Sequence, residues 1–359
     1  MKTQALAVGR ILITLVLAFA AGAIIMVVSG KDPVNAYSVL INSAIGGERA
    51  IANTLLAATP LIFTGLAALV AFRAGVFNVG VEGSLYIGAF AAAWVGFTLI
   101  DLPGLLLIPL AFAAAAVTGG LWGAVPGYLK ARYKVDEVVT TIMLNYVAIL
   151  FTDYLVNGPF LVPGMANAMS AEVAPQAQLA RILPRSQWNL SFFVAIGVMI
   201  VMIILMRRLT LGYEIRVLGT NPLFARWSGM PVRRIIVIVM FISGLIGGLA
   251  GAGQVLGVHY RFVAGFSQGL GFDGIIVALL GRGSPVGVLL AALFFGALRS
   301  GGSTMELFTR IPRDLVDILV ALIIFFIAID IGFDWLRRRR TTAPPTGTLE
   351  PALPAREGN

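Results

Sequence analysis

The chain has 359 residues, of which 58% are hydrophobic and only 12% are charged, and its formal net charge is +9. Soluble domains carry roughly twice that charged fraction, so the composition excludes an ordinary soluble enzyme. The absence of cysteine excludes disulfides, a thiol nucleophile and thiolate metal sites. Long apolar runs predict an all-α polytopic membrane protein, because a β-barrel would show short alternating segments. The basic residues gather at the ends of these runs, so we expect no nucleic-acid partner.

About ten transmembrane helices are predicted, which places residues 1–333 in one membrane domain. In chain order the candidate spans are residues 11–29, 51–72, 76–100, 105–128, 138–156, 191–206, 235–256, 272–280, 287–298 and 315–331. The first is interpreted as a retained span, since its apolar stretch is longer than that of a typical signal peptide. The tail 334–359 contains four consecutive arginines at 337–340 and is rich in proline and threonine, which predicts a basic, disordered segment.

The distribution of lysine and arginine predicts the orientation. With the N-terminus inside, most of the 26 basic residues fall on the inner side of the membrane, as the positive-inside rule requires. Both termini are therefore expected in the cytoplasm. Residues 157–190 become a long outer loop, and residues 207–234 become a cytoplasmic loop.

The cytoplasmic loop is predicted to contain a short helix with defined ends. Asn221 can act as N-cap, Pro222 suits the first helical position, and Gly229 ends the run. The sequence therefore predicts a short, well-delimited helix in this loop.

This short helix is also amphipathic. Leu223, Phe224 and Trp227 fall on one face, while Arg226 points elsewhere. An apolar face in a cytoplasmic loop indicates a docking partner, and we expect that partner to supply the energy for transport. The inner segment 130–137 is a second candidate contact for the same partner.

Two glycine-interrupted segments resemble each other weakly. FNVGVEG (77–83) and FSQGLGFDG (266–274) each contain an aromatic residue and a carboxylate followed by glycine, namely Glu82 and Asp273. In the predicted topology they enter from opposite sides, as expected of an inverted repeat with glycine-broken helices. A substrate path would then run between them, close to Glu82 and Asp273.

Two polar residues of the first segment have alternative roles. Glu82 either lines the path and accepts a hydrogen bond from a sugar hydroxyl, or caps backbone N–H groups that a broken helix leaves free. Asn78 has the same two roles, and its amide could pair with a base or a ribose without the cost of burying a charge.

Three further residues complete the candidate path. Thr141 and Asn145 lie one turn apart in the span 138–156, where they either line a cavity or bind a neighbouring helix. Phe266 could stack on an aromatic ligand or anchor the chain at the membrane interface. Both alternatives stay open for each residue.

Three stretches resemble the permease subunits of bacterial ABC importers for nucleosides. They are RAGVFNVGVEGSLYIGA (73–89), VDEVVTTIMLNYVA (135–148) and GYEIRVLGTNPLFARWSGM (212–230). The wider group includes permeases for ribose-type sugars and, more distantly, for branched-chain amino acids. The first two stretches are typical of the nucleoside and simple-sugar branch, whereas the third is shared more widely.

The resemblance implies a permease that binds no cofactor and uses ATP hydrolysed by a separate cytoplasmic ATP-binding subunit. It also implies a second, non-identical permease subunit and an extracytoplasmic substrate-binding lipoprotein, with a nucleoside as substrate. A ribose-type sugar remains the first alternative. A transporter driven by protons or sodium is the second, with Glu82 and Asp273 as its possible coupling carboxylates.

Overall fold

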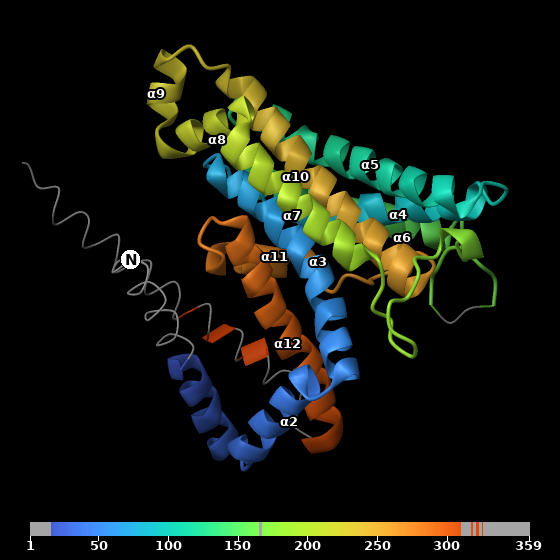
Figure 1. Cartoon of the computed structure of the whole chain (residues 1–359). Coiled ribbons are helices and arrows are strands. Elements are labelled where there is room, and N and C mark those ends of the chain that lie inside the picture. The colour runs from blue at the N-terminus through green and yellow to red at the C-terminus, as the bar shows by residue number, and fades with distance from the viewer. Residues whose placement is uncertain (1–15, 165–166, 310–316, 319–320, 323–324, 326–359) are drawn as a thin grey trace, which may run out of the picture. The chain divides into compact units, whose positions relative to one another are not determined.

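The computed structural model describes residues 16–164, 167–309, 317–318, 321–322 and 325 (Figure 1). It separates into two compact units, one formed by Met1–Lys31 with Asp317–Asn359 and the other by Asp32–Val316. In the first unit the described part contains an apolar helix, Val16–Val28. Most of the predicted span 315–331 and the predicted tail 334–359 lie outside the described residues.

The second unit is built from helices, and an all-α membrane protein is confirmed. Its elements in chain order are α2 (Pro33–Ile45), α3 (Glu48–Arg73), α4 (Val81–Thr98), α5 (Gly104–Tyr133), α6 (Glu137–Asn157), η1 (Pro175–Ala177), α7 (Ser191–Arg208), α8 (Thr210–Thr220), α9 (Pro222–Trp227), α10 (Val232–Gln254), η2 (Val255–His259), α11 (Leu270–Leu280) and α12 (Pro285–Thr309). Among the described residues, 6 helices are long and apolar enough to cross a membrane, namely α3, α5, α6, α7, α10 continued by η2, and α12.

Two predicted spans do not form complete membrane-crossing helices. The span 76–100 begins as a non-helical segment, and its helix α4 starts only at Val81. The span 272–280 corresponds to α11, whose 11 residues reach about 16 Å, roughly half of a hydrocarbon core. A further helix, α2, occupies a predicted loop, where the Asp32 carboxylate caps its first turn. Half-length helices therefore form part of this bundle.

The bundle is organised around α10, which packs along α5 and α4 (Figure 1). Glycines allow this close approach: at Gly248, the Cα lies so near the backbone of Ala115 and Gly119 that a side chain would collide with it. Small residues at helix contacts are a usual means of close packing in membranes, where no hydrophobic effect draws helices together. On the other side of the unit, α3 packs against α11 and α12.

The described residues of the predicted outer loop, 157–164 and 167–190, fold against the bundle at the end away from α8 and α9 (Figure 1). The backbone N–H of Val173 donates to the carbonyl of Tyr260 at 2.8 Å, and that of Ala174 donates to the carbonyl of Gly96 at 2.9 Å. These bonds attach the loop to the ends of both α10 and α4. Its residues thus cover one mouth of the bundle.

Candidate functional site

A non-helical segment, residues 74–80, enters the bundle before α4. Asn78 is buried and donates from Nδ2 to the Ser243 hydroxyl at 2.8 Å, near the middle of α10. Its Oδ1 accepts from the backbone N–H of Gly80 at 2.8 Å. Since Ser243 lies halfway along a spanning helix, this segment reaches the interior of the membrane domain.

Backbone groups that are not in a helix need partners inside a membrane, because no water is there to bind them. Two side chains of α6 provide them for this segment. Asn145 donates from Nδ2 to the carbonyl of Val79 at 2.9 Å and accepts the N–H of Gly83 at 2.8 Å. The Thr141 hydroxyl lies 3.3 Å from the N–H of Val79 and donates to the carbonyl of Glu137 at 2.6 Å. Asn145 therefore joins α6 to both sides of the break.

The Glu82 carboxylate bridges the two glycine-rich segments. Its side chain is 2% exposed. Oε1 accepts the backbone N–H of Gly269 at 3.2 Å, and Oε2 accepts that of Gly271 at 2.5 Å. Glu82 thus caps the first turn of α11, a helix 189 residues further along the chain. A carboxylate at a helix N-terminus also interacts favourably with the helix dipole.

The half-helix α11 is held at both ends. Near its start, Asp273 forms an ion pair with Arg299 of α12, and both side chains are only partly exposed. Beyond its end, Arg73 of α3 donates from Nε to the carbonyl of Gly283 at 2.7 Å. The first turn of α11 is therefore bound to Glu82, and the segment after its last turn is bound to the end of α3. With 11 residues, α11 is long enough for about half of the hydrocarbon core.

An aromatic cluster lies next to this junction. The half-buried Phe266 ring contacts Tyr86, Phe262 and His259, with centroids 5.0, 5.5 and 5.9 Å away. Tyr86 and Phe262 are buried, so Phe266 has the most accessible side chain of these three residues. The cluster offers an aromatic surface beside the polar junction.

The second candidate site is the short helix α9. As predicted, the Asn221 side chain caps it by accepting the N–H of Phe224 at 2.9 Å, and Gly229 follows with φ of 77°. Leu223, Phe224 and Trp227 are 64%, 54% and 82% exposed. Within the described part of the chain, nothing covers this apolar face.

Three residues that make contacts at these sites were not predicted from the sequence. Ser243 lies in a glycine-rich apolar span, where a lone hydroxyl is a usable signal of a buried hydrogen bond. Arg299 directly follows the predicted span 287–298, yet it lies within α12. Tyr86 follows Glu82 by one helical turn, so its position on the same face could have been inferred.

A bundle of membrane-crossing helices, in which the half-length helix α11 meets the interrupted start of α4 and an exposed amphipathic helix lies at one end, defines a membrane transport permease. The chain belongs to the family described as the branched-chain amino acid transport system / permease component, which matches residues 50–328. It is the permease subunit of an ABC importer, and a multi-pass membrane protein.

Several relatives are similar over most of the chain. The guanosine ABC transporter permease protein NupP of Bacillus subtilis is 42% identical, over 88% of this chain and 92% of the relative. The nucleoside ABC transporter permease protein NupB of Lactococcus lactis is 36% identical, over 89% and 90%. The glucose ABC transporter permease protein TsgB13 of Haloferax volcanii is 34% identical, over 96% and 94%. No solved structure matches the chain.

Proposed function

We propose that this permease carries nucleosides across the bacterial inner membrane, with ATP hydrolysed by a separate cytoplasmic subunit. The observation that carries the proposal is the similarity along most of the chain to permeases named for guanosine and for nucleosides. The chain itself would bind no cofactor. Both termini would lie in the cytoplasm, on the side where α9 and most of the basic residues lie.

The ATP-binding subunit would dock on the apolar face of α9. Helix α9 rests on the bundle through the buried Ala225, and it follows directly after α8. Helix α8 is tied to α7, because Arg216 donates from Nη1 to the carbonyl of Met206 at 2.7 Å. Its Gly219 packs against the backbone at Arg73, the end of α3. A push on α9 would therefore reach two spanning helices through backbone contacts, which are stiff.

The substrate would pass the junction of α4 and α11. Asn78, Thr141, Asn145 and Glu82 already use their polar atoms within the chain, so their contribution here is to hold the broken segments in place. Phe266 keeps an accessible ring beside this junction and could stack on a nucleobase. Asp273, half-buried beside Arg299, would lie on the same path.

A sugar is the second candidate substrate, because the glucose permease TsgB13 is similar over almost the whole chain. A transporter coupled to protons or sodium is disfavoured by the family and by the carboxylates themselves. Glu82 is occupied by two backbone N–H groups and Asp273 by Arg299.

The remaining partners would be a second, non-identical permease and an extracytoplasmic substrate-binding lipoprotein. A pair is supported by the two guanosine permeases of Bacillus subtilis, since this chain is 42% identical to NupP and 28% identical to NupQ. Residues 157–190, which cover the mouth away from α9, would face the lipoprotein.

The test is ATP hydrolysis in liposomes that contain the purified complex, with receptor and ligand added. Stimulation by a nucleoside and not by ribose or glucose is expected. Stimulation by a sugar alone would leave the ATP-driven mechanism in place and replace the substrate. Uptake without an ATP-binding subunit, abolished by a protonophore, would overturn the proposal.

A further inference from the structure

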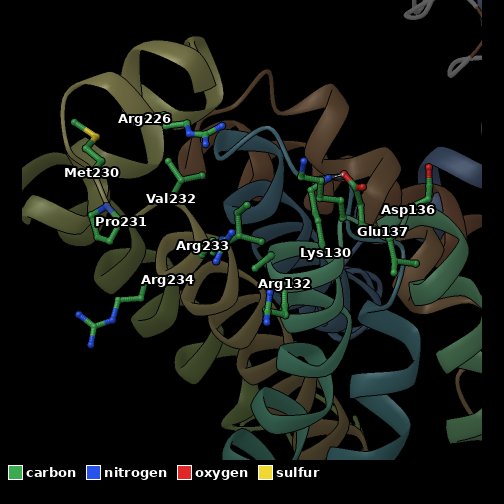
Figure 2. A pocket seen from close by; sticks show the side chains of 14 residues that line it. Lys130, Arg132, Asp136, Glu137, Arg226, Met230, Pro231, Val232, Arg233 and Arg234 are labelled. Carbon is green, nitrogen blue, oxygen red and sulfur yellow. Dashed lines mark ion pairs between the residues drawn. The ribbon is translucent and has the colours of Figure 1, made fainter.

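A basic groove lies where the ends of α5 and α6 meet α9 and α10 (Figure 2). Its volume is 840 Å³, within the range of about 300–1,000 Å³ typical of small-molecule sites. One wall comes from segment 130–137 and the other from segment 226–236. The fold thus brings the two inner segments that the sequence singled out around a single groove.

The groove has an excess of positive charge. Six basic side chains line it against two acidic ones: Lys130, Arg132, Lys134, Arg226, Arg233 and Arg234 against Asp136 and Glu137. Glu137 is engaged by an ion pair with Lys130, drawn in Figure 2. Asp136 caps α6, accepting the N–H groups of Val138 and Val139 at 2.8 and 3.1 Å.

The other five basic residues have no carboxylate partner within the residues that the structure describes. The helix dipole accounts for cations at the end of α5, but it does not explain why Arg226 and Arg233 point into the same groove (Figure 2). Concave surfaces lined by one sign of charge concentrate counter-ions. The ligand is therefore an anion, and arginine is the side chain best suited to a phosphate.

The groove opens onto apolar surface. Exposed residues on α5 recur at helical spacing, namely Val117, Leu121, Val125 and Tyr128, and the row leads to the exposed Arg132. On α10, Ile238 is exposed one turn beyond Arg234. A phosphate held by the arginines would thus lie at the head of a strip suited to hydrocarbon.

Aromatic side chains mark the depth of this site in the membrane. Tyr128 and Tyr133 are both exposed, with ring centroids 6.2 Å apart, and the guanidinium of Arg132 lies 5.7 Å from the Tyr133 ring centroid. Tyrosines with an apolar body and a polar tip gather at the level of lipid headgroups. These tyrosines therefore place the groove at the level of the lipid headgroups.

We propose that this groove binds the phosphate of an anionic phospholipid, with the acyl chains along the exposed strip of α5. Basic pockets between spanning helices are suited to such headgroups. The lipid would fix the distance between the end of α5 and the start of α10, next to α9. The proposal needs only a membrane-spanning chain and does not depend on the transported substrate.

The test measures lipid binding to the full-length chain in detergent by native mass spectrometry. Phosphatidylglycerol should bind more tightly than phosphatidylethanolamine. Arg132→Gln and Arg233→Gln should each lower the affinity for phosphatidylglycerol about fivefold, which is the effect expected for one cation near a lipid phosphate. Arg208→Gln, an exposed arginine at the end of α7 that does not line the groove, should leave the affinity unchanged.

Other results would overturn the proposal. They are equal affinity for both lipids, an equal loss in Arg208→Gln, or binding of free glycerol phosphate as tight as that of phosphatidylglycerol. Loss of the ATP-binding subunit from Arg132→Gln, with lipid affinity intact, would instead assign the groove to a protein partner. Circular dichroism and thermal unfolding of each variant separate a lost site from a lost fold.

Discussion

The Glu82 carboxylate and the backbone N–H of Gly271 form a hydrogen bond of 2.5 Å between the first turns of α4 and α11. Each helix starts inside the membrane domain, so the bond joins the two places where the regular helical pattern is interrupted. A conformational change that moves α11 relative to α4 must break this hydrogen bond, whereas one that keeps the bond must move both helix starts together.

Replacing Glu82 should destabilise the fold. Glu82→Ala leaves the N–H groups of Gly269 and Gly271 without an acceptor, at a cost of about 1–3 kcal/mol for each buried group. Glu82→Gln retains one acceptor oxygen and should fall between Glu82→Ala and the natural protein. Denaturant titration in detergent micelles measures the free energy of unfolding, with Glu48→Ala, an exposed first-turn carboxylate of α3, as control. Equal stability of Glu82→Ala and Glu48→Ala would contradict the capping role.

Two buried polar residues of α6, Asn145 and Thr152, allow a matched comparison. Asn145→Leu removes the hydrogen bonds to the carbonyl of Val79 and to the N–H of Gly83. It should lower the free energy of unfolding by about 1–3 kcal/mol for each lost bond. Thr152→Val is the control, because the buried Thr152 hydroxyl binds only carbonyls of its own helix. If both variants unfold alike, the amide of Asn145 does not hold the segment.

The ion pair between Asp273 and Arg299 should show coupling in a double-mutant cycle. Asp273→Asn or Arg299→Gln leaves one half-buried charge without its partner, so each single change should cost more than the double change. Thermal unfolding of the four proteins gives the coupling directly. Additive effects would mean that the pair contributes nothing to holding α11 against α12.

The apolar face of α9 should be necessary for transport and dispensable for folding. Phe224→Glu places a charge where an apolar partner is expected, at a cost above about 1.4 kcal/mol, so nucleoside uptake should fall roughly tenfold or more. Leu209→Glu is the matched control, since Leu209 is 52% exposed against 54% for Phe224 and lies outside α9. Unchanged uptake by Phe224→Glu would remove α9 from the coupling mechanism.

Close packing around α10 should be sensitive to a single methyl group. Gly248→Ala overpacks the contact with α5 and should cost about 1–3 kcal/mol. At Gly197 in α7, an added Cβ meets nothing within 4 Å, so Gly197→Ala should be neutral or slightly stabilising. The melting temperatures of the two variants test this. Equal melting temperatures would show that the contact between α10 and α5 can accommodate an added methyl group.

The sequence by itself determined the features that depend on composition and on neighbouring residues. Its apolar runs specified helices in a membrane. The start of α9 was also readable, because Asn221 and Phe224 are three residues apart and the cap is formed within one turn. The same holds for the exposed apolar face of α9, which follows from helical spacing alone.

Only the tertiary structure decided the partners of the buried polar groups. The Glu82 carboxylate was expected either to accept a hydrogen bond from a sugar hydroxyl or to cap the N–H groups of its own broken segment. It caps backbone N–H groups, but these lie 187 and 189 residues away. Segments 130–137 and 226–236 likewise read as separate basic stretches until they formed one groove. A hydrogen bond over such a separation depends on how helices pack, and the packing is set by many small contacts, such as that of Gly248, which no local pattern records.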